Sequence, residues 1–235
     1  MADRCQLYYI TDRSQFCGDE RARRRALLAK VAEAAHARVD YIQLRERDLS
    51  ARELEVLAKD ALTAIRDSAP LRTENRELRT GSDPRTRLLI NSRTDVALAA
   101  GADGVHLRAD DITPDEVRQI LTASVASVPR PLTTDHFLVA VSCHSNEDVK
   151  HAESAAADFA VFAPVFGKSS APGTRPTGLA ALNEACRAKI PILALGGVTI
   201  ENAASCLRAG AAGIAGIRFF QENKIEDIVR AVRTL

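Results

Sequence analysis

The stretch LLINSRTDVALAAGADGVHL, residues 88–107, contains a complete strand–helix–strand unit and sets the expectation for the fold. An apolar run leads into a helix-like segment that closes on a glycine, and a second apolar run follows it. The same joint of helix end, glycine and strand returns in RAGAAGIAGI, residues 208–217, and more loosely in HARVDYIQL, 36–44, and ESAAADFAVF, 153–162. Such an internal echo predicts one structural unit repeated along the chain.

Apolar runs of strand length recur along the whole chain, at residues 7–11, 41–45, 88–91, 104–107, 137–143, 159–165, 191–195 and 213–217. The segments between them have helical periodicity, and two open with a capping residue, Ser50 or Thr113, followed three residues later by an acid. Strands covered on both faces read as continuous apolar runs, as these do. Eight strands alternating with helices predict an α/β fold, a single (β/α)8 TIM barrel over residues 1–235, with an open doubly wound sheet as the alternative. Two longer polar segments, 67–87 and 127–136, are expected to be solvated insertions.

Composition and charge exclude several classes of protein. The chain is 46% hydrophobic and 27% charged with a formal net charge of +1, so no field for a nucleic acid or a membrane surface is expected. No apolar run approaches the roughly 18 residues of a membrane span, and the N-terminus lacks the pattern of a signal peptide. The five cysteines form no Cys-x-x-Cys pair, which favours reduced thiols over a disulfide framework or a zinc site. We therefore expect a cytoplasmic protein, with the oligomeric state, including a homodimer, left open.

In a parallel barrel, the residues at the carboxyl ends of the strands converge on one pocket. In this chain they are Asp12, Gln43, Arg45, Arg47, Asn91, Ser92, Arg93, Arg108, Asp110, Asp111, Ser142, His144, Lys168, Ser169, Ser170, Gly196, Gly197, Gly216 and Arg218. This set is rich in hydrogen-bond donors and cations and poor in hydrophobic side chains. It indicates an anionic, phosphorylated small molecule as the ligand.

Two features indicate where such a ligand would bind. Gln43, Arg45 and Arg47 alternate along a strand and share the face that points into a barrel, where they are costly unless they are paired or bind something. The alternative for Arg45 is a structural ion pair with an acid of a neighbouring strand. The last two strands end in glycines, and Thr199 is a natural N-cap for the next helix, a combination that suits a phosphate. The alternative for Gly197 is that glycine there only allows tight packing.

The motifs in order resemble those of thiamine phosphate synthase and its close relative, the thiazole tautomerase. The resemblance covers nearly the whole chain and rests on YYITDR, QLRERDLS, LLINSRTDVALAAGADGVHL, VSCHS, APVF and LALGGVTIENAASCLRAGAAGIAGI. It implies a (β/α)8 barrel. It also implies a transferase of thiamine biosynthesis that joins hydroxymethylpyrimidine diphosphate to thiazole phosphate and releases pyrophosphate, with Mg²⁺ on the diphosphate.

Roles for individual residues follow from the resemblance and are expectations. Catalytic roles are implied for Arg47 and Asn91. Substrate binding is implied for Gln43, Arg45, Ser142, His144, Lys168, Ser169, Ser170, Gly197, Gly216 and Arg218. Asp111 matches a magnesium ligand, and Ser92 stands where a second metal carboxylate is expected.

The chain departs from the synthase pattern at residues expected to take part in catalysis or to bind the metal and the phosphate. Arg47 replaces the usual lysine, and Ser92 replaces an aspartate that would hold Mg²⁺. Arg108 with Ala109 replaces a Gly-Gln pair, and Arg218 follows an isoleucine where a phosphate-binding serine is usual. Arg108 would then supply part of the metal's charge, and Arg218 would take the phosphate.

Two alternatives to the synthase remain open. The tautomerase branch resembles this chain in having arginine at position 47 and no aspartate at 92, but its proposed acid/base histidine is Pro164 here. His144 is the nearest replacement, unless it only caps the helix that starts at Asn146. The other alternative is a non-catalytic relative that binds phosphorylated ligands.

Overall fold

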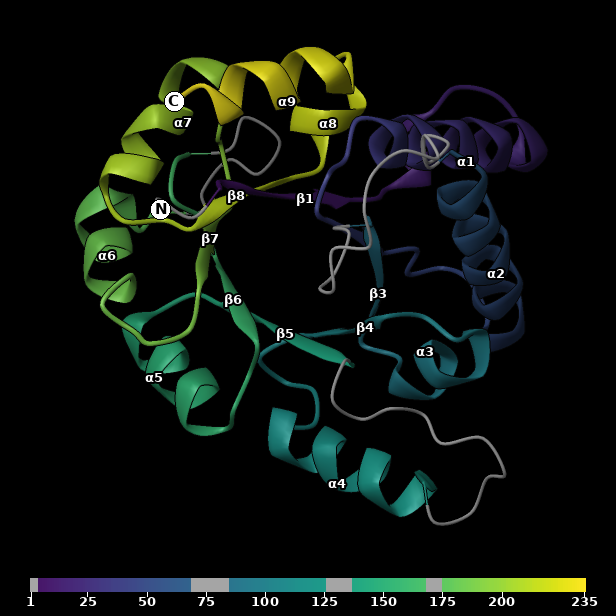
Figure 1. Ribbon diagram of the computed structural model, residues 1–235, viewed down its shortest axis with the longest axis horizontal. Helices are drawn as coiled ribbons and strands as arrows, with labels where there is room; N and C mark the ends of the chain where they lie inside the picture. Colours follow the sequence, from purple (N-terminus) through teal and green to yellow (C-terminus); the bar gives the residue numbers. More distant parts are fainter. Residues whose placement is uncertain (1–3, 69–84, 126–136, 168–174) are drawn as a thin grey trace, which may run out of the picture.

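The computed structural model describes residues 4–68, 85–125, 137–167 and 175–235. Its strands form one closed parallel barrel in which each pairs with its neighbours in sequence and β1 closes the ring against β8. The strands are β1 (Gln6–Ile10), β2 (Tyr41–Leu44), β3 (Arg87–Asn91), β4 (Gly104–Leu107), β5 (Leu138–Cys143), β6 (Phe159–Phe162), β7 (Ile192–Ala194) and β8 (Gly213–Gly216). The predicted (β/α)8 TIM barrel is confirmed (Figure 1).

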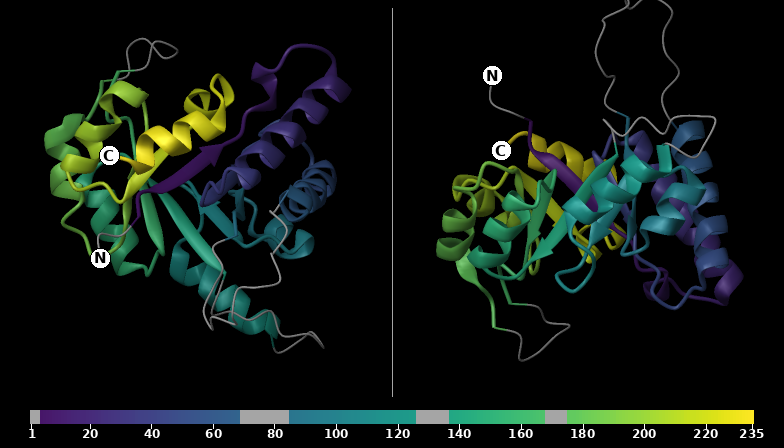
Figure 2. Two further views of the ribbon diagram at one scale, coloured as in Figure 1. Left: turned by 45° about the horizontal axis from the view of Figure 1, so that its top comes forward. Right: turned by 90° about the horizontal axis from the view of Figure 1, so that it is seen from below.

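Helices surround the barrel on its outside, as two further views also show (Figure 2). They are α1 (Glu20–His36), α2 (Ala51–Ser68), α3 (Thr94–Ala100), α4 (Pro114–Val125), α5 (Asn146–Ser154), α6 (Gly178–Ala185), α7 (Ile200–Arg208), α8 (Arg218–Gln221) and α9 (Ile225–Arg233), with a short 3-10 helix, η1 (Arg13–Gln15). The predicted caps are present, since the Ser50 and Thr113 N–H groups donate to Glu53 and Glu116 at 2.9 and 2.7 Å. The two predicted insertions lie almost wholly outside the described residues. None of the described helices is long and apolar enough to cross a bilayer.

The repeated joint that opened the sequence has a steric reason at each of its glycines. Gly101 and Gly210 end helices in the left-handed region, with φ of 72° and 103°, where glycine has no Cβ penalty. Gly104 and Gly213 begin the strands that follow, and a Cβ on them would lie 2.2 and 2.1 Å from carbonyl oxygens of the neighbouring strands. The repeated sequence therefore specifies the end of a helix, followed by a strand that packs closely against its neighbour.

The strands bury both faces, which explains their continuous apolar runs. Leu7 and Tyr9 face the helices, whereas Tyr8 belongs to a separate cluster inside the barrel. In that interior cluster Tyr41 stacks on Phe159 with ring centroids 4.8 Å apart. The interior is therefore packed with aromatic rings, and the polar inward residues occupy the carboxyl end of the barrel.

Candidate active site

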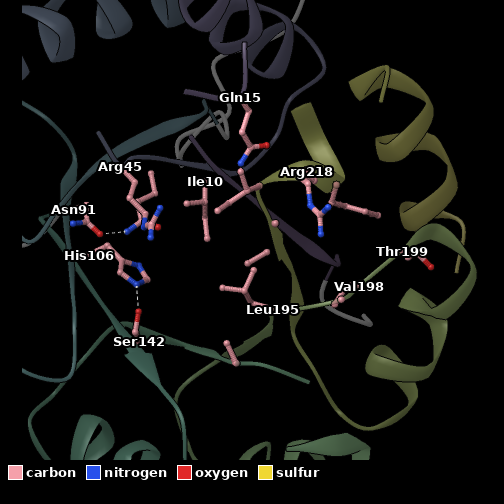
Figure 3. Close-up of a pocket in the computed structure, with 18 of the residues that line it drawn as sticks. Ile10, Gln15, Arg45, Asn91, His106, Ser142, Leu195, Val198, Thr199 and Arg218 are labelled. Carbon is pink, nitrogen blue, oxygen red and sulfur yellow. Dashed lines mark hydrogen bonds between the residues drawn. The ribbon is translucent and has the colours of Figure 1, made fainter. Parts of the chain in front are cut away.

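The carboxyl ends of the strands surround a cavity of about 860 Å³. The predicted residues that line it are Gln43, Arg45, Arg47, Asn91, Arg108, Asp110, Ser142, His144, Gly196, Gly197, Gly216 and Arg218. In Figure 3 Arg45, Asn91, His106 and Ser142 lie on one side, Arg218, Val198 and Thr199 on the other, and Ile10 and Leu195 between them. Lys168, Ser169 and Ser170 lie outside the described residues. The pocket thus has two polar ends joined by an apolar middle.

Some predicted residues are near the pocket but do not line it. Asp12 caps η1 by accepting the backbone N–H of Ser14 at 3.2 Å. Arg93 pairs with Asp95 at 2.5 Å at the start of α3. Ser92 and Asp111 are absent from the lining and act on it through hydrogen bonds.

A directed chain of hydrogen bonds runs from β2 across β3 to the loop after β4. Gln43 Nε2 donates to Asn91 Oδ1 at 2.9 Å, and Asn91 Nδ2 donates to Ser92 Oγ at 3.1 Å. Ser92 in turn hydrogen-bonds the Asp111 carboxylate. Because an ionised carboxylate only accepts, the Ser92 hydroxyl donates to it, and Asn91 is held in one orientation.

The Asp111 carboxylate is already stabilised as an anion by its surroundings. Its Oδ2 accepts the backbone N–H of Arg108 at 2.7 Å, and the Arg108 guanidinium lies 3.3 Å from Oδ1. Burial acts to raise the Asp111 pKa, but the Arg108 N–H, the Ser92 hydroxyl and the guanidinium outweigh it and hold that pKa below its ordinary value. Arg108 also lies 3.3 Å from Asp110, so it links two acids at the pocket mouth.

Arg45 is a half-buried cation that faces the pocket directly after β2. Its side chain has no acidic partner within 4.0 Å among the residues that the structure describes, so the alternative of a structural ion pair is not supported there. Burial first, and the neighbouring Arg47 second, lower the pKa of Arg45. The Arg45 guanidinium therefore lacks a counter-ion among the described residues, and a bound anion would supply one.

The acid between these two arginines has a partner elsewhere. Glu46 is buried and accepts from Thr11 at 2.6 Å and from Arg13 Nη1 at 3.1 Å. Arg13 also binds Asp48 at 2.6 Å and Glu20 at 2.8 Å. This network fixes the loop after β2 and leaves Arg45 and Arg47 for the pocket side. Sequence reasoning did not single out Arg13, although it lies in the YYITDR motif.

The opposite end of the pocket is built from glycines. Gly196 and Gly197 both have positive φ, and a Cβ on Gly197 would lie 2.5 Å from the Gly167 carbonyl oxygen. Close packing is therefore one reason for glycine at this position, and the phosphate role stays a prediction. Thr199 is the N-cap of α7, as predicted. Arg218 reaches the same end, with Nε 4.0 Å from Glu222.

Comparison with known proteins gives this pocket a family. A model of the thiamine monophosphate synthase family matches residues 7–220. The chain is 36% identical to a putative thiamine-phosphate synthase 2 of Aquifex aeolicus over 92% of this chain and 98% of that protein. The chain belongs to the thiamine monophosphate synthase family. It is also 39% identical to a putative thiamine-phosphate synthase of Geobacter sulfurreducens, over 89% of this chain and 83% of that protein.

Solved structures agree with this membership. A thiamine phosphate pyrophosphorylase from Pyrococcus furiosus superposes with a TM-score of 0.72 at 25% identity, over 99% of this chain and 96% of that one. A 3-hexulose-6-phosphate synthase, at 16% identity and a TM-score of 0.60, shares the fold alone. The sequence-based prediction of a thiamine phosphate synthase-like transferase is thus confirmed as a family assignment.

The residues at the expected metal position fit a Mg²⁺ ion that arrives on a phosphorylated substrate. The described residues contain no group of three or more His, Cys, Asp or Glu that would hold a metal ion by themselves. Asp111 offers one carboxylate beside the Ser92 hydroxyl. Mg²⁺ often takes one or two carboxylates and completes its shell with water and substrate phosphates. The donor set thus offers one carboxylate, which is thin for the free ion and which a magnesium diphosphate would share with Arg108.

His144 does not cap α5, because that position is held by Ser145, whose side chain accepts the backbone N–H of Asp148 at 3.1 Å. The proposed capping alternative is therefore wrong. Instead, Nδ1 of the exposed His144 lies 2.8 Å from the Ala163 carbonyl oxygen. Because a carbonyl only accepts, Nδ1 carries the proton and Nε2 is left available in the pocket.

A buried histidine in β4 was missed from the sequence. His106 lines the pocket directly across from Asn91 in strand register. Its Nδ1 lies 3.0 Å from the Tyr8 hydroxyl, and its Nε2 lies 2.8 Å from Ser142 Oγ. The sequence did contain a signal for this residue. His106 is the third residue of the apolar run at 104–107, and it points inward if Asn91 does.

Proposed function

We propose that the protein joins hydroxymethylpyrimidine diphosphate to thiazole phosphate and releases pyrophosphate, as a synthase of thiamine biosynthesis. The observation that carries the proposal is the half-buried Arg45, which faces the pocket without an acidic partner among the described side chains. Family membership supplies the reaction class. The cytoplasmic location expected from the sequence is part of this proposal. All five cysteines are free thiols.

The cationic end of the pocket would bind the diphosphate. Arg45 and Arg47 follow β2, and Arg108 follows β4, so three guanidinium groups from these two strand ends line the pocket. Positive charge held there stabilises negative charge as it develops on departing pyrophosphate. Asn91, fixed between Gln43 and Ser92, would orient the pyrimidine carbon that loses this leaving group.

Magnesium, when bound, would neutralise the leaving diphosphate as a Lewis acid. Asp111 is the carboxylate that would hold it, and Ser92 orients that carboxylate through its hydrogen bond. Arg108 would have to share Asp111 with the ion, because its backbone and side chain both contact that carboxylate.

The glycine end would bind the thiazole phosphate. Gly197 and Gly216 line this end without side chains, so a phosphate could approach the backbone there, and Arg218 adds a cation. Ile10 and Leu195 lie between the two ends in Figure 3 and form an apolar middle for the two rings. Each substrate would then extend from its own end of the pocket into this apolar middle. The two reacting rings would meet there in a fixed alignment.

One observation favours a second candidate, a thiazole phosphate tautomerase. The His144 imidazole is anchored to the carbonyl of Ala163, directly beside Pro164, where that branch has its proposed acid/base histidine. Its free Nε2 could move a proton on a thiazole held at the glycine end. This function needs no diphosphate and no magnesium.

The experiment supplies the substrates separately and together. The synthase forms thiamine phosphate, seen by mass spectrometry, only when both substrates and Mg²⁺ are present. The tautomerase converts the thiazole phosphate isomer alone, seen by proton NMR, and loses that activity in His144→Gln. Binding of both ligands without either product would identify a non-catalytic relative.

An internal control uses the cationic end. Arg45→Gln should lower synthase kcat/KM at least 100-fold, about 2.7 kcal/mol of transition-state stabilisation. Arg93→Gln, which removes a guanidinium already paired with Asp95 outside the pocket lining, should leave the rate within a factor of two. Equal losses in both variants would show that Arg45 has no special role.

A further inference from the structure

Three hydrogen-bonding side chains from separate strands line up across the barrel below the pocket. Tyr8 of β1 is fully buried, His106 of β4 is 2% exposed, and Ser142 of β5 lines the pocket. The tyrosine oxygen lies 3.0 Å from His106 Nδ1, and His106 Nε2 lies 2.8 Å from Ser142 Oγ. Figure 3 shows the histidine ring directed at Ser142.

The buried phenol decides which way these hydrogen bonds run. The rings of Tyr41 and Phe159 pack edge-on against Tyr8, and His106 Nδ1 is its one hydrogen-bond partner among the described residues. A buried O–H without an acceptor is costly, so the phenol donates to Nδ1.

A single proton on the histidine ring then completes the order. Burial, and to a lesser degree the positive charge of Arg45, lower the pKa of His106 to about 3, so the ring is neutral at physiological pH. With Nδ1 accepting, the one ring proton sits on Nε2 and is donated to Ser142 Oγ. The hydroxyl of Ser142 therefore accepts from the protein and keeps its own hydrogen for the pocket.

We propose that Tyr8, acting through His106, makes Ser142 a hydrogen-bond donor to an unprotonated ring nitrogen of the substrate pyrimidine. Tyr8 is thus a positioning residue that never touches the ligand. The identity of the heterocycle rests on the proposed function. Ser142 lies on the same side of the pocket as Asn91, and the apolar side chains of Ile10 and Leu195, which would face a ring, lie between that side and the glycine end.

The first test reads the histidine tautomer in the ligand-free protein. Long-range ¹H–¹⁵N correlation spectra of ¹⁵N-histidine-labelled protein distinguish a proton on Nε2 from one on Nδ1, and His106→Gln assigns the signal. The expected result is the Nε2–H form at neutral pH. An Nδ1–H form would overturn the proposal. This readout needs no substrate and no turnover, so its failure is distinguishable from a failure of the synthase assignment.

The second test measures binding of hydroxymethylpyrimidine without its diphosphate, by titration calorimetry. Ser142→Ala should weaken binding roughly 10-fold, the value of one hydrogen bond in a buried site. Tyr8→Phe should weaken it in the same direction, because the tautomer is no longer fixed. The double variant should bind no more weakly than Ser142→Ala alone, since Tyr8 acts only through that hydroxyl.

A matched control lies next along the strand. Tyr9 is equally buried, its hydroxyl has no partner among the described groups, and it faces the helices instead of the barrel interior. Tyr9→Phe should leave both the tautomer and the binding constant unchanged. Additive losses in the Tyr8 and Ser142 double variant, or equal effects of Tyr8→Phe and Tyr9→Phe, would refute the relay. If Tyr8→Phe does not fold, the wild-type tautomer alone decides.

Discussion

His106 should make the folded protein lose stability in mild acid, and His106→Gln should remove that loss. The imidazole is 2% exposed inside the barrel, and burial, followed by the charge of Arg45, lowers its pKa to about 3. In the unfolded chain a histidine titrates near its ordinary value of about 6.5. Between these two values the unfolded state binds a proton that the folded state does not.

The sign and size follow from this difference in proton binding. Stability rises with pH wherever the unfolded state binds more protons, so the contribution of His106 is unfavourable below about pH 6.5 and grows until about pH 3. Each pH unit in this window costs about 1.4 kcal/mol, so lowering the pH from 7 to 5 should reduce the free energy of unfolding by about 2 kcal/mol through this residue.

The assay is urea unfolding followed by circular dichroism at pH 7 and pH 5. His106→Gln will lower stability at both values because it disturbs the contacts with Tyr8 and Ser142, so the quantity to compare is the change between the two. Carboxylate contributions are common to both proteins and cancel in that comparison. The wild type should lose about 2 kcal/mol more than the variant. Parallel stability profiles for the two proteins would show that His106 is not held neutral.

Three further predictions concern the network, the metal position and the repeated joint. Arg13→Ala should lower the free energy of unfolding by about 3–5 kcal/mol because it leaves the buried Glu46 uncompensated. Glu20→Ala, which removes one of the two exposed partners of Arg13, should cost less than about 1 kcal/mol in the same urea titration. Ser92→Asp should raise synthase activity and lower the Mg²⁺ concentration for half-maximal rate, since position 92 has φ of 60°, which aspartate tolerates; a fall in activity would show that Ser92 belongs to a different working arrangement. Gly104→Ala should cost about 1–3 kcal/mol through overpacking, while Gly167→Ala, with no atom of the described residues within 4 Å of the added carbon, should leave the melting temperature nearly unchanged in calorimetry.

The fold could be predicted because local sequence features mark the helix ends and strand starts of its repeated unit. The strand at 104–107 was predicted to the residue, since Gly101 stops the preceding helix and Gly104 permits the strand contact. The strand predicted at 159–165 is shorter, ending at Phe162, because Pro164 cannot donate to a sheet ladder. Helix and strand boundaries thus followed the residues that break backbone hydrogen bonding.

The site was only partly predictable, and the reason is burial inside apolar runs. Gln43 and Asn91 were expected at one pocket because strand ends in a barrel converge, and both line it and also hydrogen-bond each other. His106 was missed because the run at 104–107 reads as an ordinary buried strand. Only the register against β3 shows that its side chain faces inward. Arg13 was missed because its partners Glu46 and Asp48 lie in the loop after β2, which only the fold brings beside it.

The metal position shows the limit of reading roles from residue types. Asp111 was predicted as a magnesium ligand and Ser92 as its weaker partner. The structure joins the two by a hydrogen bond and sets Arg108 on the same carboxylate. These contacts depend on the loop after β4, whose path the sequence pattern does not define.

The most direct measurement of the central claim is a count of products in a single reaction. The protein, both heterocyclic substrates and a series of Mg²⁺ concentrations are mixed, and thiamine phosphate and pyrophosphate are quantified over time. The proposed synthase forms the two in equal amounts, at a rate that rises with Mg²⁺ and is lost in Arg45→Gln. No thiamine phosphate at any Mg²⁺ concentration, from protein that still binds both substrates, would contradict the assignment of synthase chemistry to this pocket.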